Sequence, residues 1–140
     1  QLYGDEGKDV VVGGRGEDFI FGGAGSDKLT GGLEADTFIF QWSDFFSVNS
    51  KGDLVFNKSI DKITDFTVEQ GDGFDFSDLG VGELDASYTE LSKAMEDEAQ
   101  LFYIKGKIYY DVGTQMDQEY KPVVIITLTG SPVLDADQIL

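Results

Sequence analysis

Four aspartates stand nine residues apart near the N-terminus, each in a similar glycine-rich setting. Aligned at this period, the chain reads GDEGKDVVV from Gly4, GGRGEDFIF from Gly13, GGAGSDKLT from Gly22 and GGLEADTFI from Gly31. The sixth residue of each unit is Asp and the eighth is apolar, which gives the pairs Asp9 and Val11, Asp18 and Ile20, Asp27 and Leu29, and Asp36 and Phe38. Solvated turn carboxylates would leave this shared register unexplained. The chemistry that the pattern indicates is metal binding through oxygen ligands.

The composition excludes most other kinds of site. The chain has 10 basic and 27 acidic side chains, a net charge of −17, and neither His nor Cys. Zinc sites, thiol nucleophiles, disulfides and His-based triads are therefore excluded. Such a charge repels nucleic acid and anionic lipid, and no apolar run approaches the ~20 residues of a membrane helix, so we expect no nucleic-acid partner and no membrane insertion. With no paired carboxylates outside the glycine turns either, we expect no enzymatic activity.

Each unit is expected to form a tight glycine turn followed by a very short strand whose middle residue faces the core. Two units then make one flattened coil of eighteen residues, and successive coils stack as parallel strands about 4.8 Å apart. Turns eighteen residues apart become neighbours, so we expect Asp9 beside Asp27 on one edge and Asp18 beside Asp36 on the other. Facing carboxylates repel unless a divalent cation lies between them, and turn carbonyls can complete the ~6–8 oxygen ligands that calcium prefers.

These units resemble the nonapeptide repeats of the RTX (repeats in toxin) family. The resemblance implies an all-β fold, a right-handed parallel β-roll with Ca2+ held between turns two repeats apart. On matching positions it implies one site with the carboxylates of Asp9 and Asp27 and a second with those of Asp18 and Asp36. The implied carbonyl ligands are those of Gly4, Glu6, Gly23 and Gly25 in the first site and of Gly13, Arg15, Gly32 and Glu34 in the second.

Two residues depart from the repeat pattern. Asp5 replaces the second glycine of the first unit, and Glu34 replaces the fourth-position glycine of the last. A left-handed backbone costs a non-glycine residue ~1–2 kcal/mol. We therefore expect a remodelled turn at Glu34 and altered carbonyl ligands in the second site.

Beyond residue 40 the period ends. We expect residues 41–140 to form a β-rich cap, packed as one domain on the roll of residues 1–40, because an open roll leaves strand edges unpaired. Apolar and polar residues alternate from Leu101 to Asp111 on both sides of Lys105-Gly106, which predicts a β-hairpin. A further strand is expected from Val123 to Thr129.

One short helix is expected in the cap. Ser87 and Glu90 fit a capping box, and the apolar stripe would be Leu91, Ala94 and Met95. Core packing, in preference to a carbohydrate-stacking platform, is expected for a group of aromatic residues. These are Trp42, Phe45, Phe46, Phe66, Phe74, Phe76, Tyr103, Tyr109 and Tyr110.

Acidic residues continue after the repeats. The family places acidic ligands just after the roll, so Asp61 and Asp65 are expected as further calcium ligands, with solvated strand-end carboxylates as the alternative. For Asp72, Asp75 and Asp78 a polar loop is the expected structure.

Three later segments extend the resemblance. DKITDFTVEQGDGFDFSDL from Asp61, LFYIKGKIYYDVG from Leu101 and VVIITLTGSPVLDADQIL from Val123 are similar to segments that follow the roll in serralysin-type proteases, alginate epimerase modules and RTX adhesins. The resemblance implies a calcium-dependent folding and type I secretion module at the C-terminus of a larger extracellular protein, which we interpret as an adhesin. The chain would then be secreted by, or displayed on, a Gram-negative bacterium.

The expected partners are calcium, the type I secretion transporter during export of the unfolded chain, and upstream repeats of the parent chain. A start at Gln1, inside a repeat and without Met, favours the excised end of a longer protein. The alternative function is a polyuronate-binding accessory module, or the C-terminal module of a secreted enzyme. A net charge of −17 without a basic track opposes binding of an anionic polyuronate.

Overall fold

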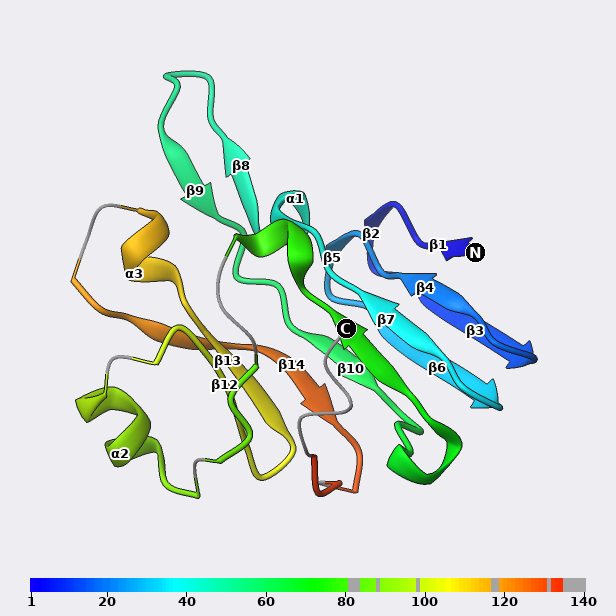
Figure 1. Ribbon diagram of the computed structural model, residues 1–140. Coiled ribbons are helices and arrows are strands. Elements are labelled where there is room, and N and C mark those ends of the chain that lie inside the picture. The colour runs from blue at the N-terminus through cyan, green and yellow to red at the C-terminus, as the bar shows by residue number, and fades with distance from the viewer. Residues whose placement is uncertain (81–83, 88, 98, 117–118, 131, 135–140) are drawn as a thin grey trace.

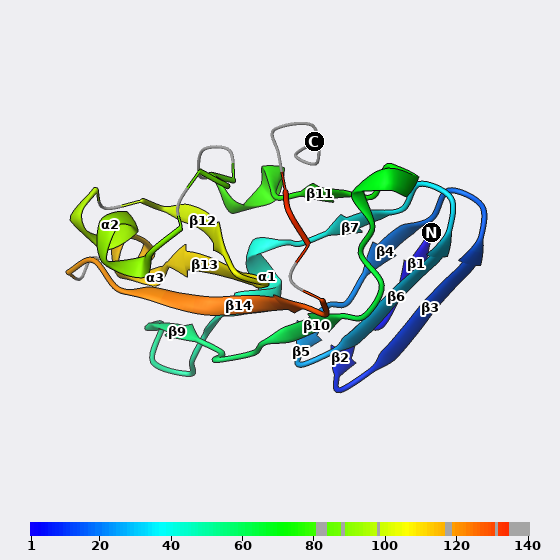
Figure 2. The same ribbon diagram turned by 90° about the horizontal axis from the view of Figure 1, so that it is seen from below.

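Two facing sheets build the N-terminal half of the molecule (Figures 1 and 2). The structure is a computed structural model, and it describes residues 1–140 except 81–83, 88, 98, 117–118, 131 and 135–140. One sheet has four parallel strands, in the order β1 (Leu2–Tyr3), β4 (Phe19–Phe21), β7 (Thr37–Ile39) and β11 (Gly73–Asp75). The other contains β3 (Val10–Arg15), β6 (Lys28–Leu33) and β10 (Asp61–Ile63), which are also parallel.

The strands pair in the eighteen-residue register that the repeat period predicts. Val11 lies opposite Leu29 in one sheet, and Ile20 lies opposite Phe38 in the other. The turns themselves also pair, through β2 (Glu6–Gly7) and β5 (Ala24–Gly25). The all-β fold with a parallel roll of repeats is therefore confirmed.

The parallel stacks continue beyond the regular repeats. β10 pairs with β6 and β11 pairs with β7, so a third coil lies on the second although it lacks the nonapeptide pattern. Ile63 continues the buried column of Val11 and Leu29, and Phe74 continues the column of Ile20 and Phe38. Full burial of each such side chain contributes about 1.5–3 kcal/mol, so these columns hold the coils together.

The cap extends the second sheet. β14 (Pro122–Leu128) pairs in parallel with β10 and antiparallel with β13 (Lys107–Asp111), which forms a hairpin with β12 (Leu101–Ile104). The hairpin turn is Lys105-Gly106, with φ of 47° and 81°, as a two-residue turn between twisted strands requires. The predicted hairpin and the predicted strand near Val123 are both confirmed. A second hairpin, β8 (Phe46–Val48) and β9 (Leu54–Phe56), projects from the body (Figure 1).

The helix prediction was only partly right. α2 runs over Leu91–Glu96 with Glu90 as its N-cap, and the side chain of Ser87 donates to Asp85, so the Ser87/Glu90 capping box was wrong. Of the predicted apolar stripe only Ala94 is buried. The described residues also contain helices α1 (Trp42–Phe45) and α3 (Val112–Gln115) and the 3-10 turns η1 (Val68–Gln70) and η2 (Ser77–Leu79).

The aromatic residues form the core between the sheets and the cap. Phe66 stacks on Phe74 with ring centroids 4.4 Å apart, and Phe40 stacks on Phe76 at 5.4 Å. Of the nine residues expected to pack there, Trp42 and Tyr109 are partly buried and the others are buried. No helix in the described part of the chain has the length and apolar character that crossing a bilayer demands.

Candidate metal centre

The glycine turns share one backbone conformation. The second position of every unit has positive φ, and so does the fourth. Asp5 and Glu34 follow this rule, with φ of 73° and 81°. The expected remodelling at Glu34 was therefore wrong, because this residue keeps the left-handed conformation of the fourth position despite its side chain.

Close contact between neighbouring turns accounts for the glycines that remain. A Cβ atom on Gly25 would lie 1.5 Å from the carbonyl oxygen of Gly7 in the preceding coil, and one on Gly23 would lie 2.0 Å from that of Asp5. Only a residue without a side chain permits this approach. Backbone carbonyls of successive turns are thus brought together on each edge of the roll.

The aspartates form two chains of hydrogen bonds between the coils. The backbone N–H of Asp9 donates to Oδ1 of Asp27 at 2.8 Å, and the N–H of Asp18 donates to Oδ1 of Asp36 at 2.9 Å. The predicted side-by-side pairs are therefore present in the structure. Each carboxylate therefore accepts a hydrogen bond from the preceding coil. The donor is a turn N–H group for which the strand pairing provides no acceptor.

Both chains continue into the third coil. The N–H of Asp27 donates to Oδ1 of Asp61 at 2.9 Å, and the N–H of Asp36 donates to Oδ1 of Asp72 at 3.0 Å. We name the two series the Asp9 ladder and the Asp18 ladder. The first comprises Asp9, Asp27 and Asp61, and the second comprises Asp18, Asp36 and Asp72.

Asp72 was missed because it was expected in a polar loop. It is buried, and its second oxygen accepts a hydrogen bond from the N–H of Thr67. A signal was present in the sequence, since Asp72-Gly73-Phe74 repeats the Asp-x-apolar order of Asp36-Thr37-Phe38. Asp75 and Asp78, in contrast, accept hydrogen bonds from the N–H groups of Ser77 and Trp42, outside the ladders.

Asp65 contacts the last glycine turn. One carboxylate oxygen accepts from the N–H of Gly31 and the other from the N–H of Gly32, both at 2.9 Å. Each oxygen keeps a further lone pair. Asp65 therefore braces the Gly31–Gly32 turn from the third coil, on the same edge as the Asp18 ladder.

Several carboxylate oxygens are left without a partner. Within the described residues, no hydrogen-bond donor reaches the buried Oδ2 atoms of Asp9, Asp18 and Asp27. A Cβ atom on Gly22 would lie 2.9 Å from Oδ2 of Asp27 and 3.4 Å from Oδ2 of Asp61, so both oxygens face the same glycine turn. A buried carboxylate oxygen without a partner is costly, and a hard cation is the ligand that satisfies it. These residues therefore fit calcium.

The carboxylates do not form a metal site by themselves. In the part of the chain that the structure describes, no three acidic side chains converge closely enough to hold a metal ion. Further oxygens would have to come from the backbone. In the first expected carbonyl set, Glu6 and Gly25 belong to the paired strands β2 and β5, and Gly4 and Gly23 shortly precede these strands. In the second set, Gly13, Arg15 and Gly32 belong to the paired strands β3 and β6, and Glu34 follows β6 directly.

Burial makes the charged form of the ladder unfavourable. Burial, followed by repulsion from neighbouring carboxylates, raises the pKa of Asp61 to about 8 and that of Asp36 to about 6. The pKa values of Asp27 and Asp72 are raised for the same leading reason. A divalent cation among these groups would relieve the repulsion and keep the carboxylates ionised.

A comparison with protein-family models identifies the repeats. Residues 3–38 match the family model of the RTX calcium-binding nonapeptide repeat in four copies. A search of curated protein sequences finds no match. Among solved structures, the solution structure of the AlgE6R3 subunit from the Azotobacter vinelandii mannuronan C5-epimerase is 26% identical, with a TM-score of 0.48. The match covers 95% of this chain and 66% of that one, so this chain spans a little under two thirds of that structure.

Proposed function

We propose that the chain is a module whose folding is driven by calcium, because residues 3–38 match the family model of the RTX calcium-binding nonapeptide repeat. The observation that supports this is the pair of aspartate ladders, in which buried carboxylate oxygens have no donor within the described residues. Without a cation these oxygens oppose folding. Calcium supplies positive charge and accepts many oxygen ligands without demanding strict geometry.

The proposed ligands are the carboxylates of Asp9, Asp18, Asp27 and Asp36, with the turn carbonyls expected from the repeats. Asp61 extends this set, and we add Asp72 because its hydrogen bond to Asp36 repeats that of Asp36 to Asp18. Asp65 would contribute through its remaining lone pairs while bracing the last glycine turn. We propose that residues 1–40 are the regular repeats and residues 41–140 are the cap. Strands β10 and β11 belong to the cap and pair with β6 and β7 of the repeats.

The free energy of calcium binding makes folding depend on location. A ligand that binds only the folded state stabilises it by RT ln(1 + [L]/Kd), about 1.4 kcal/mol per site at tenfold excess, and several sites add. Calcium is scarce inside a bacterium and abundant outside. We propose that the chain stays unfolded for export by a type I transporter and folds outside, as the C-terminal module of a larger protein such as an adhesin. The repeats themselves belong to a non-catalytic family.

Circular dichroism with chelator and with millimolar calcium tests the folding proposal. We expect a cooperative gain of β signal with calcium, and a much weaker response to magnesium, which needs a smaller octahedral shell. A spectrum that chelation leaves unchanged would refute it. Export is tested separately, with a reporter protein fused before Gln1 in cells with and without a type I transporter. A reporter found outside in both cases would rule out the export role.

A further inference from the structure

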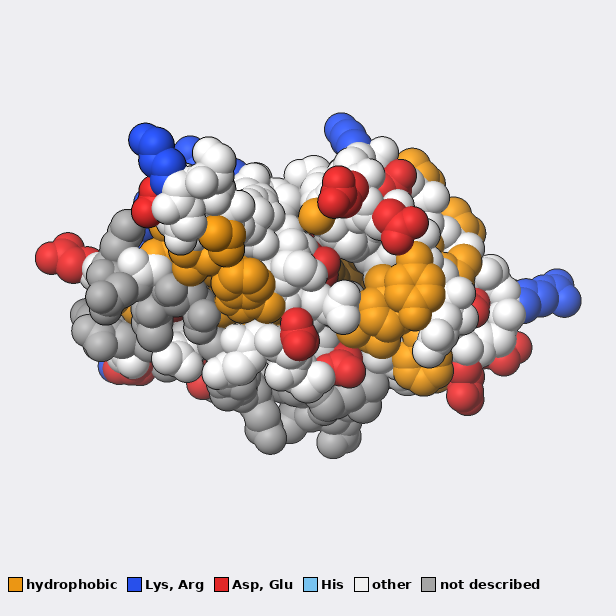
Figure 3. Space-filling model, turned by 90° about the horizontal axis from the view of Figure 1, so that it is seen from above, with side chains coloured by type: hydrophobic (Ala, Val, Ile, Leu, Met, Phe, Trp, Pro, Cys, Tyr) orange, Lys and Arg blue, Asp and Glu red, His pale blue; other side chains and the backbone are white. Residues whose placement is uncertain are grey.

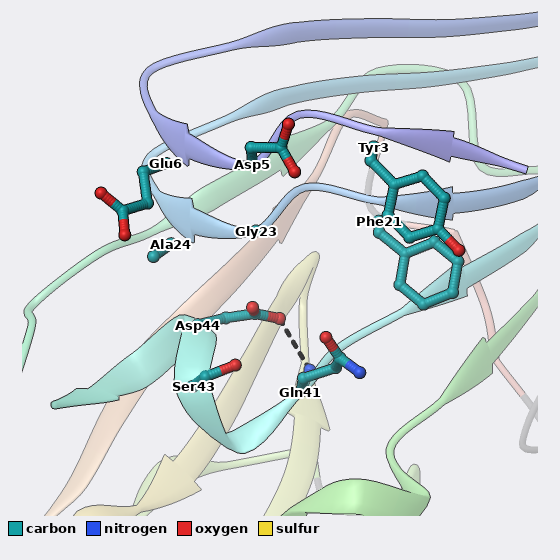
Figure 4. A pocket seen from close by; sticks show the side chains of 9 residues that line it. All are labelled: Tyr3, Asp5, Glu6, Phe21, Gly23, Ala24, Gln41, Ser43 and Asp44. Carbon is teal, nitrogen blue, oxygen red and sulfur yellow. Dashed lines mark hydrogen bonds between the residues drawn. The ribbon is translucent and has the colours of Figure 1, made fainter.

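A cavity of about 640 Å3 lies between the first turns and helix α1. Figure 4 shows Asp5 and Glu6 on one side of it, Gln41, Ser43 and Asp44 on the other, and the rings of Tyr3 and Phe21 at one end. The calcium-dependent folding proposed above gives no role to these side chains. Their combination is the feature to be explained.

The aromatic end of the cavity is an exposed stack. Tyr3 and Phe21 are paired residues of β1 and β4, and their rings are nearly parallel, 4.5 Å apart at 15°. The side chain of Tyr3 is 58% exposed. Leu2 and Ile20, their neighbours in the strands, supply the pair that lies toward the core. The aromatic pair therefore contributes an open ring surface and not core packing.

The remaining walls are acidic. Three carboxylates line the cavity, those of Asp5, Glu6 and Asp44, and none of its lining residues is Lys or Arg. Asp44 is only 4% exposed, and one of its oxygens accepts from the N–H of Gln41 at 2.7 Å. The ion pair found among the described residues joins Lys93 and Asp97, in helix α2 and its cap. Within the described residues, the cavity carboxylates therefore form no ion pair with a basic side chain.

The charge around the cavity agrees with its lining. On the face shown in Figure 3, red acidic side chains border the orange hydrophobic surface at the end of the molecule that carries the N-terminal strands. The whole chain has a net charge of −17. Cations are therefore attracted to this face, and anions such as polyuronates are repelled.

We propose that this cavity binds an arginine side chain presented by a partner peptide. A guanidinium group stacks flat on aromatic rings and also donates paired hydrogen bonds to carboxylates, which uses both kinds of wall at once. A calcium ion would use the carboxylates and leave the Tyr3 and Phe21 rings without a role. A lysine ammonium would gain the charge but not the planar stacking.

The probe is a blocked Gly-Arg-Gly tripeptide, added to the chain in saturating calcium. Its matched control is the Gly-citrulline-Gly tripeptide, which has the same shape without the charge. We expect NMR shift changes at Tyr3, Phe21 and Asp44. The fluorescence of Trp42, which stands in the sequence between the lining residues Gln41 and Ser43, should also change. The citrulline peptide should bind at least about tenfold more weakly than the arginine peptide. Equal binding of the two peptides would overturn the proposal.

Variants separate the cavity from general attraction to an acidic surface. Asp5→Asn and Tyr3→Leu should each weaken arginine binding by about threefold to tenfold, and Asp53→Asn, at the tip of the β8–β9 hairpin, should leave it unchanged. Asn tolerates the positive φ of residue 5. Asp5→Asn is therefore expected to fold, and it tests arginine binding in the cavity even if Tyr3→Leu fails to fold. Equal weakening by Asp5→Asn and Asp53→Asn would refute the cavity, as would tighter binding of a mannuronate trisaccharide there. Neither result bears on the calcium titration.

Discussion

The carboxylate of Asp27 accepts a hydrogen bond from the backbone of Asp9, eighteen residues earlier, at 2.8 Å. Asp27 in turn donates its own N–H to Asp61 at 2.9 Å. It is therefore the middle member of the Asp9 ladder, bonded on both sides, and its side chain is only 3% exposed. Asp9 belongs to the first coil described and is bonded on one side.

Replacement of Asp27 should therefore cost more than replacement of Asp9. Asp27→Ala leaves the N–H of Asp9 without its acceptor, a loss of about 1–3 kcal/mol in the free energy of unfolding beyond any loss of calcium. Asp9→Ala removes no described hydrogen bond between the coils. Urea unfolding in saturating calcium measures the difference. Equal destabilisation by the two variants would contradict the ladder.

Double variants test which aspartates share a calcium site. If Asp9 and Asp27 act together, the Asp9→Ala/Asp27→Ala double should bind no less calcium than Asp27→Ala alone, because one site cannot be lost twice. Asp18→Ala/Asp27→Ala should show additive losses, because the two residues belong to opposite edges. Calorimetric stoichiometry decides between these outcomes. Additive loss in the first double would disprove the shared site.

Gly25 and Gly7 form a matched pair for the contact between turns. Both have positive φ, but a Cβ on Gly25 would overlap the Gly7 carbonyl at 1.5 Å, whereas a Cβ on Gly7 would meet only Oδ2 of Asp9 at 3.9 Å. Gly25→Ala should lower the free energy of unfolding by about 1–3 kcal/mol more than Gly7→Ala. Urea denaturation in calcium gives both values. If the two alanine substitutions cost the same, backbone strain alone would explain the regular spacing of glycine in the turns, and the close contact would not matter.

The repeat period was sufficient to predict the first two coils. A side-chain alternation of two and a unit of nine residues fix which strands pair, and hence which aspartates become neighbours. The third coil lacks that period, since Asp61 follows Asp27 by 34 residues and Asp72 follows Asp36 by 36. The β8–β9 hairpin and the η1 turn fill these longer connections. Only the Asp-x-apolar order marks the third coil in the sequence.

Short local patterns predicted less well. The Ser87/Glu90 box has the right residue types, but Ser87 bonds to Asp85 and the helix begins only after Glu90. A polar side chain with several possible partners does not define a helix start by itself. The Lys105-Gly106 hairpin was predictable because a glycine-containing pair stands between two alternating segments, and the structure gives both turn residues the positive φ that such a turn requires.

Glu34 offers a stabilising change. Its φ of 81° places a non-glycine residue in the left-handed region, where the other three units have glycine. Glu34→Gly should raise the free energy of unfolding by up to about 1–2 kcal/mol, less the extra entropy of glycine in the unfolded chain. Glu17→Gln, an exposed change of the same charge, is the control for charge alone. A stabilisation that Glu17→Gln reproduces would mean that charge relief and not backbone strain is the cause.

Without calcium, acid should favour the folded state. Burial raises the pKa of Asp36 and of Asp44 to about 6 and that of Asp61 to about 8, above the ordinary value of 3.8. The folded chain then binds more protons than the unfolded chain between these values. The free energy of unfolding in the absence of calcium therefore increases as the pH falls from 8 toward 4. The same contribution disappears as the pH rises through about 6, where Asp36 and Asp44 ionise, and then through about 8, where Asp61 ionises.

Circular dichroism in chelator at pH 5 and pH 8 measures this effect, and we expect more β signal at pH 5. Asp61→Asn should remove the part of the change above pH 6, since the amide keeps an oxygen acceptor for the N–H of Asp27 but cannot ionise. Saturating calcium should reverse the trend, because protons then compete with the cation for the same oxygens. A calcium-free chain that gains no structure at pH 5 would mean that charge repulsion in the ladders is not what keeps it unfolded.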